Sequence, residues 1–142
     1  MKKLFENIFV AGQINPSDFP AMVAAGVKII INNRPDNEEP GQFSSTDAEQ
    51  LAQEHGISYH YLPMANGQPL PDNLVSEFKA IVNSTSEPIL THCRSGMRSS
   101  FLWALGQIED GNVSVDQAVD CAQSAGIPLA NARAVLESVQ PT

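Results

Sequence analysis

Short apolar runs alternate along the chain with longer segments in which apolar residues recur every three or four positions. The short runs have the length and composition of β-strands, and the longer segments have the spacing of amphipathic helices. The most continuous apolar run is 27–32, as expected for a central strand that is buried on both faces. The predicted strands are 8–11, 27–32, 59–62 and 88–92, and the predicted helices are 17–25, 46–56, 72–83, 99–108, 114–125 and 128–138.

Several helix ends are marked by residues with strong end preferences. Gly26 and Gly126 follow predicted helices at the position where glycine commonly ends one. The segments 46–49 and 114–117 fit capping boxes that begin helices. This order of strands and helices predicts one α/β domain, residues 1–142, with three layers and a mainly parallel sheet of about four to five strands flanked by helices.

The composition agrees with a single domain. A chain of 142 residues that is 42% hydrophobic can bury one core and is too short for two ordinary domains. It has no apolar run of the length that spans a membrane, and its first residues lack the apolar stretch of a secretory signal. Two cysteines do not make a disulfide scaffold. We therefore expect a cytoplasmic protein, where a catalytic thiol stays reduced.

The charge balance restricts the possible partners. The net charge is −8, from 16 acidic and 8 basic residues, which argues against nucleic acid and against an anionic membrane surface. Three of the eight basic residues, Arg34, Arg94 and Arg98, lie in segments that we place around the candidate site. The local potential there can be positive although the whole chain is acidic. For Arg34 and Arg94 the alternative is that they are ordinary solvated side chains.

The segment 92–99 carries the candidate chemistry, because it places a cysteine, a glycine and an arginine between a predicted strand and a predicted helix. The backbone N–H groups of such a loop point inward and the loop ends on a helix N-terminus, so we expect a cavity that binds an oxyanion. The same field favours the thiolate form of Cys93, and the thiolate is the nucleophile. The pattern indicates covalent catalysis, with an inert buried thiol as the alternative.

The residues that follow Cys93 have separate predicted roles. Gly96 lets the backbone approach a ligand closely, and the planar guanidinium of Arg98 fits two oxygens of a tetrahedral anion. Ser99 is placed to donate a hydrogen bond to the Cys93 sulfur when that sulfur is a leaving group. The remaining members of the predicted substrate-binding loop are Arg94, Ser95 and Met97.

This segment resembles the signature of the cysteine-dependent phosphatases, specifically the compact dual-specificity type. The signature positions are filled by His92, Cys93, Gly96, Arg98 and Ser99. Only Met97 separates Gly96 from Arg98, where the family has two residues, so the loop is shorter by up to about 3.5 Å of chain and by one N–H donor. Six-residue loops of this form resemble those of rhodanese sulfurtransferases, in which the cysteine carries a persulfide.

A longer stretch, 8–103, resembles the small bacterial phosphatase-like domains known as beta-lactamase hydrolase-like or DUF442 proteins. The matching pieces are 10–13, 29–36, 39–42 and 93–99, whereas two segments usual in rhodaneses are absent. The resemblance implies a phosphotyrosine-phosphatase-like fold, and a His92 that orients the loop and helps to ionise Cys93. The same family has been associated with both phosphatase and sulfurtransferase labels, so both chemistries stay open.

The general acid is the least determined residue of the predicted site. The phosphatase family usually places an aspartate after the strand that precedes the catalytic strand, and this chain has Met-Ala-Asn-Gly at 64–67. An amide cannot donate the catalytic proton. We rank Asp36 first among the substitutes, because it follows the strand 27–32 at the sheet edge where ligands bind. Its alternative role is that of a turn residue, and the other candidate acids are Glu38, Glu39 and Asp72.

These observations predict a cysteine-based phosphatase that needs no cofactor. It would hydrolyse phosphomonoesters of a small molecule or a protein, protein phosphotyrosine included, through a phosphocysteine intermediate. His55 and His60 lack metal-ligand spacing and Cys121 has the spacing of a small core residue, so we expect no metal site. One alternative is a rhodanese-like sulfurtransferase with a Cys93 persulfide. Another is a non-catalytic module that binds an anion or docks a partner, which the missing aspartate favours.

Overall fold

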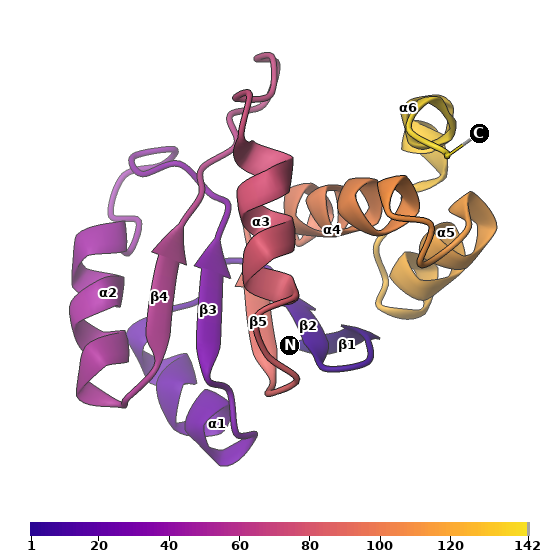
Figure 1. Cartoon of the computed structure of the whole chain (residues 1–142). Helices are drawn as coiled ribbons and strands as arrows, with labels where there is room; N and C mark the ends of the chain where they lie inside the picture. The colour runs from indigo at the N-terminus through magenta and orange to yellow at the C-terminus, as the bar shows by residue number, and fades with distance from the viewer. Residues whose placement is uncertain (142) are drawn as a thin grey trace.

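The structure, a computed structural model, describes residues 1–141 and contains a five-stranded sheet with helices on both faces (Figure 1). The strands are β1 (Lys2–Phe5), β2 (Ile8–Ala11), β3 (Ile29–Asn32), β4 (Ser58–Tyr61) and β5 (Ile89–His92). The helices are α1 (Phe19–Ala24), α2 (Ser45–Glu54), α3 (Leu74–Val82), α4 (Met97–Glu109), α5 (Val115–Ser124) and α6 (Arg133–Ser138), with two short 3-10 turns, η1 (Pro16–Asp18) and η2 (Ala130–Ala132). The predicted three-layer α/β fold is confirmed.

The strand order places β5 at the centre of the sheet. The order is β1-β2-β5-β3-β4, with β1 antiparallel to β2 and all other neighbours parallel. His92, the last residue of β5, pairs with Ala11 of β2 on one side and with Asn32 of β3 on the other. The segments that follow β2, β3 and β5 therefore leave the sheet at one edge, where α/β proteins bind ligands.

Alternate residues of the central strands pack into two separate cores. Ile31 and Ile89 belong to the core beneath α3, α4 and the C-terminal helices, whereas Ile30 and Leu90 belong to the core beneath α1 and α2. Successive side chains of a strand point to opposite faces, so a strand buried on both faces must be apolar at every position. This explains the continuous apolar run in the sequence.

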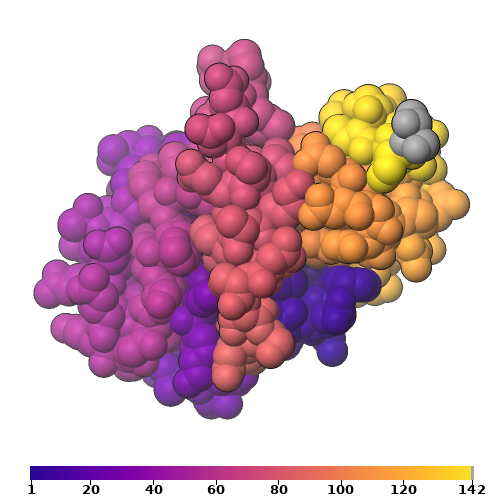
Figure 2. All heavy atoms as spheres, in the orientation of Figure 1, coloured from indigo at the N-terminus to yellow at the C-terminus, as the bar shows by residue number. Residues whose placement is uncertain are grey.

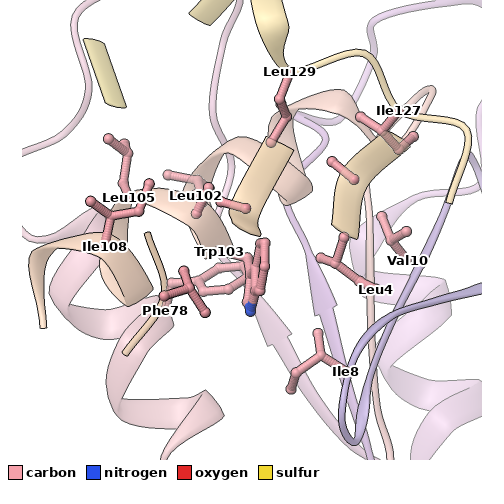
Figure 3. Close-up of a cluster of buried hydrophobic side chains, with 14 of the residues drawn as sticks. Leu4, Ile8, Val10, Phe78, Leu102, Trp103, Leu105, Ile108, Ile127 and Leu129 are labelled. Carbon is pink, nitrogen blue, oxygen red and sulfur yellow. The ribbon is translucent and has the colours of Figure 1, made fainter. Parts of the chain in front are cut away.

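The larger core holds α4 against the sheet. Trp103 of α4 is 1% exposed and lies among the side chains of Phe78, Leu102 and Leu4 (Figure 3). Its ring centroid is 5.6 Å from that of Phe5, a spacing typical of tilted aromatic pairs. Deleting a buried aromatic side chain of this size costs about 3–5 kcal/mol, so the packing of Trp103 makes a large contribution to holding α4 against the sheet.

Several element ends differ from the sequence-based prediction. β1 was not predicted, because four residues that begin with two lysines carry little strand signal; it forms by pairing with β2 across a tight turn in which Glu6 has φ 51°. Helix α2 is capped by Ser44, whose hydroxyl accepts from the Asp47 N–H, and not by a box at 46–49. The predicted capping box at 114–117 is confirmed, with Ser114 and Gln117 bonded reciprocally.

Three predicted helices also have different bounds. In the segments predicted as helices 17–25 and 128–138, a 3-10 turn (η1 and η2) precedes the α-helix, which begins at Phe19 and at Arg133. Helix α4 begins at Met97, two residues earlier than predicted, because Gly96 adopts φ 96° and directs the chain into the helix immediately after the loop. The consequence is that Arg98 and Ser99 lie on the first turn of α4.

Candidate active site

Cys93 lies at the junction between the central strand β5 and helix α4, and its side chain is fully buried. Its Sγ accepts a hydrogen bond from the backbone N–H of Gly96 at 3.1 Å. The 13-residue helix α4 begins at the next residue, so its N-terminus, which carries positive partial charge, lies beside the sulfur. The surroundings of Cys93 therefore favour a negatively charged group.

The backbone of the loop is held by residues outside it. The Gln13 N–H donates to the carbonyl oxygen of Arg94 at 3.1 Å. A Cβ atom on Gly12 would lie 2.7 Å from the same oxygen, so only glycine lets the end of β2 come this close. The C=O and N–H of a trans peptide point in opposite directions, so this hydrogen bond turns the Ser95 N–H to the side away from Gln13.

Arg98 is bound by a carboxylate and by a carbonyl group. Its Nη1 and Nη2 each donate to one oxygen of Glu38 at 2.8 Å, and Nη1 also donates to the Met64 carbonyl oxygen at 2.8 Å. These contacts use three of the five N–H groups of a guanidinium. The other two, on Nε and Nη2, lie along one edge of the group and form a fork that fits two oxygens of an anion. The pKa of Arg98 is raised, first by Glu38 and further by the nearby Cys93 sulfur.

Glu38 bridges two arginines. Its Oε1 accepts from Arg34 Nε at 2.9 Å as well as from Arg98. The hydrogen bond to Arg98, followed by the one to Arg34, lowers the pKa of Glu38 from 4.5 to about 2. The carboxylate is therefore ionised at neutral pH, and in this arrangement it has no proton to donate to a leaving group.

Arg34 is a buried component of this network and not a solvated side chain. Its side chain has no exposed surface, and its Nη1 donates to Gln13 Oε1 at 2.9 Å and to Glu39 Oε1 at 3.3 Å. Within residues 1–141 its Nη2 has no hydrogen-bond partner. Arg34 is among the residues that the sequence places around the site as substrate-binding, and in the structure it binds the same carboxylate, Glu38, that binds Arg98.

Asn33 connects the elements that surround the loop, and sequence reasoning did not select it. Its Oδ1 accepts from the hydroxyls of Ser99 at 2.7 Å and Thr91 at 3.0 Å, and its Nδ2 donates to the Leu62 carbonyl at 2.9 Å. The one feature of the sequence that could have indicated Asn33 is that it is the second of two asparagines at the end of an apolar strand. Because the Ser99 hydroxyl gives its proton to Asn33, it must rotate before it can donate to the Cys93 sulfur.

His92 is buried and uncharged. Desolvation lowers the pKa of His92 from 6.5 to about 4, so the imidazole is neutral at physiological pH. Its Nδ1 lies 3.4 Å from the Cys93 carbonyl oxygen, and its Nε2 is without a partner in the described chain. A neutral ring adds no positive charge beside Cys93, so any effect of His92 on the thiol acts through the position of the backbone.

The contacts of Asp36 indicate a structural role. Its Oδ1 accepts from the Ser45 N–H at 2.8 Å and its Oδ2 from the Ser45 hydroxyl at 2.6 Å. Its own N–H donates to the Tyr61 hydroxyl at 2.9 Å. Both carboxylate oxygens thus hold the first residue of α2, and neither is free for a leaving group. Asp72 is exposed and lies near the end of the 62–73 connection between β4 and α3, which projects from the body of the molecule (Figure 2).

The other loop residues lie at the surface or beneath it. Arg94 and Ser95 are exposed, Met97 is half-buried, and Gly96 is buried. The Ser95 Oγ accepts from the Met97 N–H at 3.3 Å and so stabilises the turn into α4. The exposure of Arg94 agrees with the alternative that it is an ordinary solvated side chain.

Neither a metal cluster nor a membrane span is found in the part of the chain that the structure describes. Across residues 1–141 no three histidine, cysteine, aspartate or glutamate side chains come together as metal ligands. No helix in that range is long and apolar enough to cross a bilayer.

Comparison with known protein sequences gives consistent matches. A family model described as the phosphatase-like domain of beta-lactamase hydrolase-like proteins matches residues 1–110. A beta-lactamase hydrolase-like protein of Agrobacterium fabrum is 33% identical over 135 residues, which are 95% of this chain and 31% of that protein. The chain therefore spans about a third of the length of this curated relative.

Two solved structures are similar over almost the whole chain. A protein of Neisseria meningitidis Z2491, described as a candidate phosphatase, is 30% identical with a TM-score of 0.87, and the match covers 98% of this chain and 97% of that one. Tk-PTP in its active form has a TM-score of 0.72 at 13% identity, covering 98% of this chain and 95% of that one. At that identity the likeness to Tk-PTP concerns the fold alone.

Proposed function

This chain belongs to the beta-lactamase hydrolase-like family of phosphatase-like domains, and we propose that it is a cysteine phosphatase acting on phosphomonoesters through a phosphocysteine. The family and its structural neighbours support the coarser statement, a cysteine-type phosphatase. One observation carries the finer proposal. The Cys93 sulfur lies beside the N-terminus of α4 and near an Arg98 whose Nε edge is available for two anion oxygens.

In the first step the Cys93 thiolate attacks the phosphorus of the bound ester. The S–P bond forms as the P–O bond to the leaving group breaks, and the electron pair leaves with the alcohol or phenol oxygen. Arg98 and the inward N–H groups of the loop bind the three other oxygens, where negative charge is spread in the transition state.

In the second step a water molecule attacks the phosphocysteine. The S–P bond breaks, its electron pair returns to the sulfur, and the water proton leaves with the phosphate or passes to solvent. The Ser99 hydroxyl donates to Asn33 Oδ1 at 2.7 Å, and after it has rotated away from that oxygen it can stabilise the departing thiolate. The Gly96 N–H, which already binds the sulfur, stabilises the same charge without any movement.

The substrate class follows from the missing acid. Glu38 is ionised and paired, and both oxygens of Asp36 are bound to Ser45, so neither carboxyl group is placed to protonate a leaving group. A phenol, with a pKa of about 10, leaves with less assistance than an alkyl alcohol does. We therefore propose aryl phosphates, the class that includes phosphotyrosine, as the preferred substrates.

A sulfurtransferase is the second candidate, and the size of the loop favours it. Only Met97 separates Gly96 from Arg98, and the Gly96 N–H contacts the sulfur itself at 3.1 Å, so a loop this short suits a small cargo such as a single sulfur atom. In that reaction the Cys93 thiolate attacks the outer sulfur of a thiosulfate, the S–S bond breaks and sulfite leaves. A second nucleophile such as cyanide then takes the sulfur from the persulfide and regenerates the thiolate.

One pair of assays separates the two candidates. The proposed phosphatase releases phosphate from an aryl phosphate, is inhibited by vanadate, and transfers little sulfur from thiosulfate to cyanide. Sulfur transfer without phosphate release would overturn the phosphatase and establish the sulfurtransferase. If neither activity is detected but the folded protein binds phosphate, the non-catalytic anion-binding module is the candidate that stands.

A further inference from the structure

We propose that Ile127, in the connection between α5 and η2, is a positioning residue for the active-site loop. Its Cδ1 atom lies over the space where a Cβ atom on Gly96 would stand, and Gly96 is the residue whose N–H binds the Cys93 sulfur. The inference concerns how the reactive form of Cys93 is maintained, and its link to turnover rests on the proposed function. The family-model match ends at residue 110, so this contact comes from the part of the chain beyond it.

Gly96 needs support from outside the loop. Its φ of 96° is one that side-chain-bearing residues rarely adopt, and glycine itself is free to leave it. The orientation of its N–H toward Cys93 is therefore not imposed by the covalent structure of Gly96. Neighbouring atoms must restrict the peptide if the hydrogen bond to the sulfur is to persist.

Of the atoms that surround the Cβ position of Gly96, the nearest belongs to Ile127. A Cβ atom built on Gly96 would lie 2.9 Å from Ile127 Cδ1, 3.2 Å from Val10 Cγ2 and 3.5 Å from the Ala11 carbonyl oxygen. The face of Gly96 is thus closed by one side chain from the C-terminal part and by two groups of β2. Figure 3 shows Ile127 and Val10 within the larger core.

Ile127 is itself held firmly. It follows Gly126, which has φ 81° and ends α5, and its N–H donates to the Ala122 carbonyl oxygen at 2.8 Å. Its side chain is 8% exposed. Helix α5 packs on α4 and on β1, so the Cδ1 atom is fixed relative to the sheet from which Cys93 emerges.

A conservative substitution removes the Ile127 atom that lies nearest the Gly96 Cβ position. Ile127→Val deletes Cδ1, the atom nearest Gly96, and keeps the rest of the side chain. Ile108→Val is the matched control, because Ile108 is 1% exposed, belongs to the same core, and lies near the other end of α4. Both substitutions delete one buried methyl group, which cores tolerate.

The test measures the ionisation of Cys93 directly. The ultraviolet absorbance of the thiolate is followed against pH, with Cys93→Ser as the reference that removes its signal. We expect Ile127→Val to move the midpoint upward by about half a pH unit to one unit, as expected for a weakened hydrogen bond to a charged acceptor. Ile108→Val should leave the midpoint unchanged.

Activity provides a second readout with a distinct outcome. For an aryl phosphate below the midpoint, kcat/KM should fall about three- to tenfold in Ile127→Val, in line with the shift of the midpoint, and recover at higher pH. An unchanged midpoint in Ile127→Val, with a loss of stability equal to that of Ile108→Val, would make Ile127 an ordinary core residue and overturn the proposal. A shifted midpoint in a protein without phosphatase activity would refute the proposed function while this inference stands.

Discussion

The Glu38 carboxylate binds the Arg98 guanidinium across its two terminal nitrogens, with both oxygens at 2.8 Å. This geometry covers the end of the guanidinium and leaves its Nε edge available, so the pair orients Arg98 and does not block it. Arg34 holds the same carboxylate from the other side at 2.9 Å. Glu38 is therefore the residue on which the direction of the anion-binding fork depends.

Glu38→Gln should lower kcat/KM for an aryl phosphate about tenfold, because the amide loses the charge and one of the acceptors that hold Arg98. Glu39→Gln is the control, since the Glu39 side chain is 51% exposed and, within residues 1–141, binds only Arg34, at 3.3 Å. We expect the control to stay within about twofold of the unmodified protein. Equal losses in the two variants, measured by steady-state kinetics, would refute the positioning role.

Acid should destabilise the fold over two successive pH ranges that overlap slightly, one set by His92 and one by Glu38. The pKa of His92 is lowered from 6.5 to about 4, so the unfolded state takes up its proton first and stability falls between these values. The pKa of Glu38 is lowered from 4.5 to about 2, so its ion pairs stabilise the fold above 4.5 and are lost as the pH falls toward 2.

Urea unfolding at a series of pH values checks this assignment. Glu38→Gln should flatten the stability profile below pH 4.5 and leave the decline that begins at 6.5 unchanged. A profile that keeps its full slope in the lower range would contradict the assignment to Glu38.

Asp36→Asn should reduce the free energy of unfolding by about 1 kcal/mol, because the amide offers one acceptor where Ser45 now has two. Aryl and alkyl phosphates should then slow by the same factor. Asp72→Asn, in the projecting connection, is the comparison. A selective loss on alkyl phosphates in either variant would identify that residue as the general acid.

Asn33→Ala should destabilise the protein by about 2 kcal/mol or more, because it leaves the Ser99 and Thr91 hydroxyls and the Leu62 carbonyl without a buried partner. Turnover should also fall, since Ser99 and the end of β4 lose their common anchor. Asn131→Ala, on the exposed η2 turn, should change neither property. Thermal unfolding and steady-state kinetics measure the two effects.

Cys93→Ser should lower kcat by about a thousandfold or more while the fold and phosphate binding are retained. The reason is that the hydroxyl has the shape of the thiol but does not ionise at neutral pH. Cys121→Ser should change little, since Cys121 lies on α5, in a different part of the fold. Full activity in Cys93→Ser would refute both enzymatic candidates at once.

Local sequence determined most of the elements and the chemistry of the loop. A run such as 27–32 is apolar at every position because both faces of its strand are buried, and Ser114 caps α5 through atoms three residues away. Cys93, Gly96 and Arg98 lie within six residues, so their placement in one loop between β5 and α4 was predictable from the order of residue types alone. Such interactions are short-range along the chain and leave a readable pattern.

Tertiary structure decided which residues complete the site. Glu38 and Arg98 are separated by 60 positions, and Ile127 reaches Gly96 from a segment that follows α5, so no spacing in the sequence relates them. The same holds for Asp36, whose carboxylate could serve as an acid or bind Ser45 until the fold brings the two together. A charged or apolar side chain takes its role from the partner that folding places beside it, and for these residues that partner is set by how the sheet, α4 and α5 pack.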